Sequence, residues 1–133
     1  MKGSYILIME NRKNSRIKAG SLGALVFPPG LYAYVGSAMR GLEARIDRHL
    51  RRKKNTFWHI DYFLKSRNVS IRQVYYKPST RKEECSIARK LSRYGRAISG
   101  FGCSDCACEG HLFWLRDKGF PERLVSSRRW FRK

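Results

Sequence analysis

Tyrosine, arginine, histidine and glutamate residues are spaced along this sequence so that predicted strands and helices could bring them together. Tyr34 precedes a glycine at the end of an apolar run, and Arg45 and His49 follow it one helical turn apart. Glu84 comes near the start of a later helical pattern. Phosphodiester hydrolysis needs an activated water, a cation near the developing charge and often a metal ion. Because an arginine can fork onto phosphate oxygens and a tyrosine can relay a proton where cations lower its pKa, the set predicts chemistry on phosphates.

Each of these residues also has an ordinary structural explanation. Tyrosines in strands are usually packing residues with a hydrogen-bonded hydroxyl. Arg45 could be one more arginine of a basic helix, and His49 could pack or cap. Glu84 shares a helical face with apolar residues, so its carboxylate needs a partner, which a metal ion or a salt bridge to Arg45 or another cation would supply. Both explanations stay open at the level of the sequence.

A second group of side chains has the composition of a zinc site. Cys103, Cys106, Cys108 and His111 offer four soft ligands within nine residues, and Cys85 is a further candidate. Zinc favours these donor atoms in a tetrahedral shell. The alternative is a set of small buried thiols under a glycine-rich loop, with the histidine starting a strand or joining the active site.

The charge balance predicts a polyanionic partner. The 133 residues include 29 Lys plus Arg against 10 Asp plus Glu, a formal net charge of +19, and basic residues cluster in 40–54 and 116–133. Phosphate backbones bind such surfaces largely through counterion release, which predicts binding of DNA or RNA. The alternative is a surface charge that only aids solubility. The candidates for nucleic-acid contact are Ser37, Arg40, Arg48, Arg51, Arg52, Lys53, Lys54 and His59.

The elements that must position these residues follow from hydrophobic periodicity. Short apolar runs indicate strands, and stripes at helical spacing indicate helices. Strands are predicted at 4–9, 16–27 (weaker), 31–36, 69–76 and 111–115, and helices at 41–52, 57–64 and 80–94, the last opened by a capping box from Thr80 to Glu83. We expect an α/β (α+β) fold with a central, mainly antiparallel sheet in which 4–9 pairs with 31–36, and helix 41–52 across one face.

Length and composition predict one domain, residues 1–115, with a basic tail, 116–133, packed on it or extending from it. No segment approaches the ~20 apolar residues of a membrane span, and the start shows no signal-peptide pattern. These features predict a cytoplasmic protein without a membrane partner. Its cysteines are then expected to be thiols or metal ligands.

Taken in order, these residues resemble the motifs of the GIY-YIG nuclease superfamily. Gly3-Ser4-Tyr5 matches the Gly-x-Tyr motif of the first strand, and Tyr34-Val35-Gly36 matches the second tyrosine motif. Arg45 matches the family's helix arginine, His49 a histidine that some members carry, and Glu84 the metal-binding glutamate.

Three further segments resemble an uncharacterised, largely archaeal branch of that superfamily. They are Tyr34-Val35-Gly36-Ser37-Ala38, Trp58-His59-Ile60-Asp61-Tyr62, and Ser104-Asp105-Cys106 through His111-Leu112-Phe113. Together the resembling features cover most of residues 3–115.

The sequence departs from the family pattern in two places. The two tyrosine motifs lie farther apart than in the usual hairpin, so residues 11–29 must contain extra structure. Gly30-Leu31-Tyr32 could also be the first tyrosine motif, but only Ala33 would then lie between the two motif tyrosines, too little for a hairpin turn. Tyr5 is therefore assigned to the first motif, and Tyr32 is kept as the alternative. Ser37 stands where some members have lysine.

The resemblance implies roles for five residues in a metal-dependent endonuclease that acts on DNA. Glu84 would hold Mg²⁺ or another divalent cation as its single carboxylate ligand, and Arg45 would neutralise the phosphate. Tyr34 would assist deprotonation of the attacking water and Tyr5 would position that water. His49 would orient the arginine or transfer a proton.

Two other functions remain open at this level. One is a non-catalytic DNA- or RNA-binding module on the same fold. The other is a zinc-stabilised RNA-binding protein, favoured by aromatic residues interleaved with charge. No small-molecule cofactor is expected in any of them. The aromatic residues concerned are Phe57, Trp58, Tyr75, Tyr76, Trp114 and Trp130.

Overall fold

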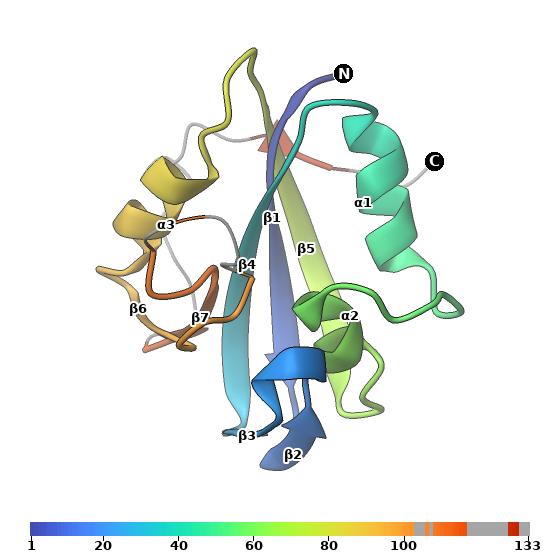
Figure 1. Ribbon diagram of the computed structural model, residues 1–133, viewed down its shortest axis with the longest axis vertical. Coiled ribbons are helices and arrows are strands. Elements are labelled where there is room, and N and C mark those ends of the chain that lie inside the picture. Colours follow the sequence, from blue (N-terminus) through green and yellow to red (C-terminus); the bar gives the residue numbers. More distant parts are fainter. Residues whose placement is uncertain (103–105, 107, 117–127, 131–133) are drawn as a thin grey trace.

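A six-stranded antiparallel sheet forms the centre of the computed structural model, which describes residues 1–102, 106, 108–116 and 128–130 (Figure 1). The strand order is β6-β7-β4-β1-β5-β8. The strands are β1 (Gly3–Asn11), β4 (Gly30–Ala38), β5 (Val69–Pro78), β6 (Gly95–Ala97), β7 (Leu112–Leu115) and β8 (Arg128–Arg129). The α+β class and the central antiparallel sheet are as expected from the sequence.

The predicted pairing of 4–9 with 31–36 is confirmed as the centre of this sheet. β1 runs antiparallel to β4, with Tyr5 opposite Gly36 and Leu7 opposite Tyr34. On its other side β1 runs antiparallel to β5, with a bulge between Ile8 and Met9. These three long strands form the rigid frame on which both tyrosine motifs lie.

Helices cover both faces of the sheet (Figure 1). On one face, α1 (Leu42–Leu50) and α2 (His59–Leu64) pack Leu42, Ile46 and Phe63 against the strand residues Tyr5, Leu7, Met9, Tyr32 and Tyr34. On the other face, α3 (Glu84–Leu91) packs Ile87, Ala88 and Leu91 against Ile6, Ile8, Ala33 and Val35. Because side chains alternate along a strand, each central strand contributes to both cores.

The weak strand predicted over 16–27 is two strands. β2 (Ser15–Lys18) and β3 (Ala24–Phe27) pair antiparallel as a separate two-stranded sheet, joined through a short 3-10 turn, η1 (Gly20–Leu22). Gly20 and Gly23 have φ of 54° and 75°, a backbone conformation that favours glycine and reverses the chain. This hairpin is the extra structure required between the two tyrosine motifs.

Helix α3 is shorter than the predicted helix 80–94, and its capping box is not formed. Thr80 lies outside the helix, whose N-cap is Glu83, with no capping bond from a side chain. The Glu83 carboxylate instead pairs with Lys77, 3.1 Å away. Residues 92–94 form a turn, and Gly95 begins strand β6, which the sequence did not predict.

The other predicted elements are confirmed with shifted ends. Helix 41–52 is α1, helix 57–64 is α2, and strand 111–115 is β7. Much of the basic tail, 117–127 and 131–133, lies outside the described residues, so its predicted contribution to nucleic-acid binding stays a prediction. No helix in the described part of the chain is long and apolar enough to cross a membrane.

Candidate functional site

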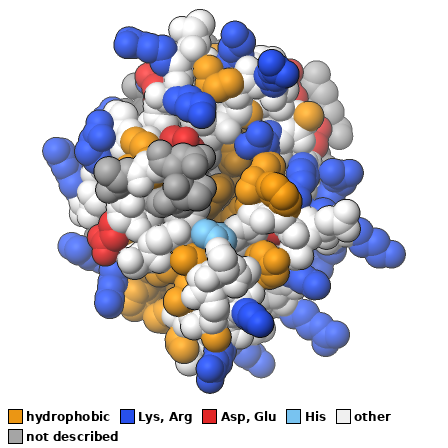
Figure 2. All heavy atoms as spheres, viewed as in Figure 1, with side chains coloured by type: hydrophobic (Ala, Val, Ile, Leu, Met, Phe, Trp, Pro, Cys, Tyr) orange, Lys and Arg blue, Asp and Glu red, His pale blue; other side chains and the backbone are white. Residues whose placement is uncertain are grey.

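Four residues singled out in the sequence line one pocket. Tyr5 from β1, Tyr34 from β4, Arg45 from α1 and Glu84 from α3 surround a cavity of about 400 Å³. Its other lining residues are Gly36, Ser37, Phe57, Trp58, His59 and Gly102. The face of the molecule drawn in Figure 2 carries many lysine and arginine side chains and fewer carboxylates.

The glycine of the second tyrosine motif is required by the first motif. Gly36 lies directly opposite Tyr5 in the ladder, and a Cβ at Gly36 would collide with the Tyr5 ring and hydroxyl. The ring cannot move aside easily because Tyr5 is only 2% exposed. The close approach of β4 backbone to this ring therefore fixes the position of the Tyr5 hydroxyl.

His49 contacts Tyr5, and no bond to Arg45 is seen among the described residues. The Tyr5 hydroxyl and His49 Nε2 are 2.7 Å apart in a buried hydrogen bond. His49 Nδ1 is buried without a partner among the described residues. Burial lowers the pKa of His49 to about 3, with a smaller contribution from Lys54. The histidine is therefore neutral, and its geometry links it to Tyr5.

Arg45 is held by a backbone oxygen and an aromatic ring. Its guanidinium donates to the Ser37 carbonyl oxygen at 3.2 Å and lies 4.6 Å from the centre of the Trp58 ring. The Ser37 hydroxyl is buried without a hydrogen-bond partner in the described part of the chain. The pocket thus presents a cation held in place, which suits a phosphate oxygen.

The two tyrosines do not have lowered pKa values from protein groups alone. Burial raises the pKa of Tyr5, and Arg45 offsets this only in part. Burial also raises the pKa of Tyr34, and the nearby Tyr5 and Glu84 raise it further. The expected lowering by Arg45 is outweighed because desolvation penalises the phenolate more than one neighbouring cation stabilises it.

Glu84 is the first residue of α3, and its side chain is 27% exposed. The apolar part of this helix packs on the opposite face of the sheet, yet Glu84 lines the pocket. Its Oε2 lies 4.0 Å from His111 Nδ1. Among the described residues it forms no salt bridge with Arg45, and its pair with His111 is an ion pair only if that histidine is protonated.

Two of the basic residues expected to contact nucleic acid are engaged within the fold. Arg48 donates to both carboxylate oxygens of the buried Asp61, at 2.9 and 3.0 Å, and lies 4.4 Å from the Trp58 ring centre. Lys54 Nζ caps the end of α1 by donating to the carbonyl oxygens of His49 and Arg51 at 2.6 and 3.0 Å. Both side chains therefore have structural roles.

The other expected contact residues lie at or beside the pocket or on the surface. Ser37 and His59 line the pocket itself, and Arg40 is exposed. His59 Nδ1 accepts the Gly102 N–H at 2.9 Å, which leaves the ring proton on Nε2, and burial lowers the His59 pKa. A second, open cavity of about 790 Å³ lies around the end of α1; its basic lining residues are Arg48, Arg51, Arg52, Lys53, Lys54 and Lys65.

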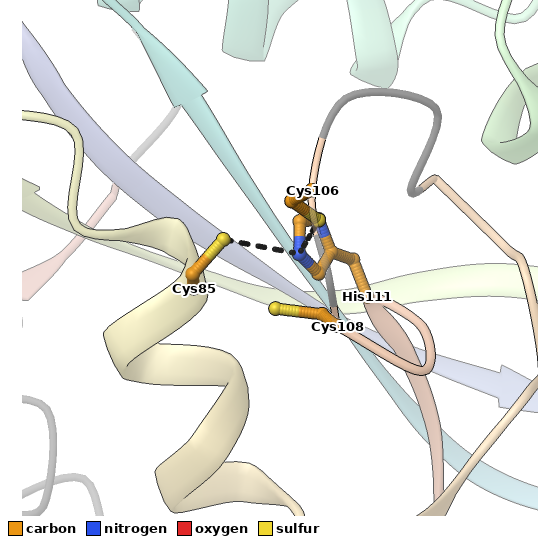
Figure 3. A group of neighbouring side chains, drawn as sticks. All are labelled: Cys85, Cys106, Cys108 and His111. Carbon is orange, nitrogen blue, oxygen red and sulfur yellow. Dashed lines mark hydrogen bonds between the residues drawn. The ribbon is translucent and has the colours of Figure 1, made fainter.

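The cysteine group differs from the predicted one in its membership. Ligand atoms of Cys85, Cys106, Cys108 and His111 all lie within 4.8 Å of one another, a group that could hold a metal ion (Figure 3). Cys85 comes from α3 and was only a further candidate in the sequence. Cys103 lies outside the described residues.

The sequence missed the aromatic wall of the pocket. Phe57 and Trp58 both line it, and the buried Asp61 fixes them by accepting both backbone N–H groups at 2.9 Å. Both aromatic residues were noticed only as part of a scattered set. The signal that could have located them is the Asp61 carboxylate at the capping position of α2, which also binds Arg48.

Fold and site together define a small, basic α+β protein with a polar pocket where both tyrosine motifs, a helix arginine and a glutamate meet, beside a thiol and imidazole cluster. The chain belongs to the family described as "Domain of unknown function DUF123", whose model matches residues 4–129. No curated protein and no solved structure gives a significant match.

Proposed function

We propose that this protein binds nucleic acid and cleaves phosphodiester bonds, with DNA as the favoured substrate and a divalent cation held by Glu84. One observation carries the proposal. Tyr5, Tyr34, Arg45 and Glu84 come from four different elements and line the same pocket. Residues that served only packing or solubility would not be expected to line one pocket together.

The pocket suits a cation bound to oxygen. Glu84 has no arginine or lysine partner among the described residues, so its charge is available at the cavity. Magnesium prefers carboxylate, water and phosphate oxygens, and one carboxylate with water and substrate is a usual ligand set. Such an ion would supply charge neutralisation and a more acidic bound water. Glu84 would be its only protein carboxylate.

Arg45 would neutralise the phosphate from the other side of the pocket. Its guanidinium is held by Ser37 and Trp58, so little conformational entropy is lost when it binds an oxygen. This fixed cation would orient the phosphate next to the Tyr5 and Tyr34 hydroxyls.

The tyrosines would act as positioned hydroxyls. Burial is the main cause of the raised pKa of Tyr34, and Tyr5 and Glu84 raise it further. A cation bound at Glu84 would cancel the contribution of that carboxylate and stabilise the phenolate, which would help Tyr34 to assist proton removal from water. Tyr5 would orient the water, with His49 holding the Tyr5 hydroxyl at 2.7 Å. In this proposal His49 positions Tyr5 and does not touch the substrate.

A separate metal is proposed for the cysteine group. Thiolates and imidazole are ligands that favour zinc, whereas the single carboxylate in the pocket favours magnesium. The zinc ion would be structural because four protein donors leave no open position for a substrate.

A non-catalytic nucleic-acid-binding module is the second candidate. The raised pKa values of both tyrosines favour it, because burial outweighs the nearby Arg45 and keeps the phenols protonated, which makes them poor proton acceptors. Both candidates predict nucleic-acid affinity that falls steeply with salt, with a slope of roughly −0.9 for each phosphate neutralised on duplex DNA.

Cleavage assays with a matched pair of variants test the proposal. Linear, branched, flapped and single-stranded DNA would be incubated with pure protein, with and without Mg²⁺. Glu84→Gln should abolish cleavage and leave binding unchanged or tighter, while Glu83→Gln should cleave as the wild type does, because Glu83 pairs with Lys77. Arg45→Ala should weaken both binding and cleavage.

The outcomes separate the two candidates. Cleavage that persists in Glu84→Gln, or in excess chelator, would exclude the proposed mechanism. Salt-dependent binding without cleavage of any of these substrates would support the binding module instead.

A further inference from the structure

We infer that Cys85, Cys106, Cys108 and His111 form a closed zinc centre, and that this centre holds Glu84 in place through His111. The four residues come from helix α3 and from the segment that leads into β7. Zinc would therefore join two parts of the chain that flank the pocket.

The spacing of the donor atoms suits a tetrahedral shell. With Zn–S near 2.3 Å and Zn–N near 2.1 Å, neighbouring ligands should be roughly 3.6 Å apart for sulfur and nitrogen and roughly 3.8 Å for two sulfurs. His111 Nε2 lies 3.5 Å from Cys106 Sγ and 3.9 Å from Cys85 Sγ. These two edges are thus close to the lengths that the ion requires, and all four donor atoms lie within 4.8 Å of one another (Figure 3).

The chemistry of the thiols also favours a cation. Three cysteine sulfurs and one imidazole nitrogen are donors that zinc prefers, and a bound zinc deprotonates its cysteine ligands. His111 is only 2% exposed, so the ring is fixed in the cluster.

His111 connects this centre to the pocket. Its Nε2 faces the sulfurs, and its Nδ1 lies 4.0 Å from Glu84 Oε2. Coordination through Nε2 leaves the ring proton on Nδ1, and metal-bound histidines commonly donate that proton to a carboxylate. Glu84 also precedes the ligand Cys85 directly on α3. The zinc centre would therefore fix both the helix start and the carboxylate orientation.

The first test measures the ion and its ligands. Protein never exposed to chelator should contain about one zinc per chain, and a cobalt-substituted sample should show the thiolate charge-transfer bands of a tetrahedral site. Cys85→Ser should lose at least nine tenths of the zinc, and Cys103→Ser should keep it, because the four described donors already fill the shell. Zinc-free wild-type protein, or zinc lost with Cys103→Ser and kept with Cys85→Ser, would overturn the assignment.

The second test follows the contact between His111 and Glu84 by nuclear magnetic resonance of the imidazole. The wild type should show Nε2 bound to metal and an Nδ1 proton protected from solvent exchange. Glu84→Ala should speed that exchange at least tenfold, and Glu83→Ala should leave it unchanged because Glu83 lies on Lys77. Equal exchange in wild type and Glu84→Ala would overturn the coupling.

The consequence for cation binding rests on the proposed function and is measured separately. Removing zinc should lower the Mn²⁺ affinity of the pocket about ten- to a hundredfold, the usual effect of losing a group that orients a ligand. Unchanged Mn²⁺ affinity without zinc would refute the positioning role. A zinc-loaded protein with the His111 contact but no Mn²⁺ binding would refute the proposed function and leave the zinc centre standing.

A different observation supports a second inference, which also rests on the proposed function: Phe57 is a stacking platform for an unpaired base. Its side chain lines the pocket and is nevertheless 78% exposed. Asp61 holds its backbone N–H, and the Trp58 ring meets it edge to face at 5.8 Å. The protein therefore presents an exposed aromatic ring, with its backbone held by Asp61, beside the pocket in a basic protein.

This ring suits a splayed nucleotide better than an intact duplex. A base can stack on an exposed phenylalanine only when it has left its own stack, and such contacts contribute about 1–3 kcal/mol per base, or roughly five- to 150-fold in affinity. The preferred substrates would then be single strands, flaps or junctions.

Comparison of two exposed side chains tests the platform. Phe57→Ala should weaken binding of single-stranded and flapped DNA at least fivefold and change blunt-duplex binding less than twofold. Val26→Ala, at another exposed apolar residue (59% exposed) on β3, should change neither. Equal loss on duplex and single strand, or no loss, would overturn the inference while the proposed function stands; absence of all nucleic-acid binding would overturn both.

Discussion

Replacing Tyr5 by phenylalanine removes one hydroxyl group from the best-buried polar contact of the pocket. The ring is 2% exposed, and phenylalanine fills almost the same volume, so no cavity is created. The group that loses a hydrogen-bond partner is the His49 imidazole. Its Nε2 loses the 2.7 Å bond, and its Nδ1 already has no partner among the described residues.

The expected loss of folding free energy follows from the buried His49 ring, which is left without a hydrogen-bond partner among the described residues. A buried polar group left without its partner costs about 1–3 kcal/mol. For a domain of this size each kcal/mol corresponds to roughly 3–5 °C in Tm. Tyr5→Phe should therefore lower the melting temperature by about 3–15 °C, with an unchanged denaturant m-value.

Tyr32→Phe is the matched control. Tyr32 is also fully buried, and its hydroxyl donates to the Pro28 carbonyl oxygen at 2.6 Å. That oxygen keeps a second donor, Asn11 Nδ2 at 3.1 Å, when the hydroxyl is removed. Because nothing is left unsatisfied, Tyr32→Phe should cost only about 0.5–1.5 kcal/mol.

Urea denaturation of the wild type, Tyr5→Phe and Tyr32→Phe measures the free energy of unfolding of each. If Tyr5→Phe costs no more than Tyr32→Phe, the reasoning that His49 depends on the Tyr5 hydroxyl is refuted. The same variant should also reduce cleavage under the proposed function, but the stability comparison is independent of activity.

Three further predictions concern residues of the pocket and of the helices beside it. Gly36→Ala should cost about 1–3 kcal/mol and displace the Tyr5 ring, measured by urea denaturation, because a Cβ has no room beside that ring; wild-type stability would contradict the packing argument. Because the folded pKa of His49 is about 3, below its ordinary 6.5, the unfolded chain binds more protons than the folded chain at acidic pH. The free energy of unfolding should therefore fall as the pH drops below about 6.5, by up to about 1.4 kcal/mol per pH unit. His49→Gln should flatten this slope between pH 6.5 and 4.5. Asp61→Asn should cost about 2–4 kcal/mol, measured by thermal unfolding, because it breaks the bidentate contact with Arg48 inside the fold; a cost below 1 kcal/mol would show that this ion pair is dispensable.

Local pattern alone determined which face of the sheet or helix each residue occupies. The alternation in β4 places Tyr34 on the face opposite Ala33 and Val35, as observed. The helical spacing of Arg45 and His49 likewise puts both on the side of α1 that faces β1 and β4. These relations depend only on the periods of strand and helix, so the sequence was sufficient.

Predictions from the local sequence pattern were wrong where another part of the fold engaged the side chain concerned. The capping box at Glu83 was predicted from spacing, but Lys77 in the preceding strand pairs with that carboxylate. Arg48 and Lys54 had the composition of phosphate contacts, yet Asp61 and the carbonyl groups at the end of α1 engage them. A sequence pattern cannot reveal these partners because they are brought together only by the packed chain.

The tertiary structure alone decided the composition of both sites. Glu84 begins a helix whose apolar face packs on the opposite side of the sheet, and only the placement of that helix brings the carboxylate to the tyrosines. The same placement brings Cys85 to Cys106, Cys108 and His111, although Cys85 precedes the nearest of them by 21 positions in the chain. Contacts between such distant segments are set by how helices dock on a sheet, and no local period encodes that geometry.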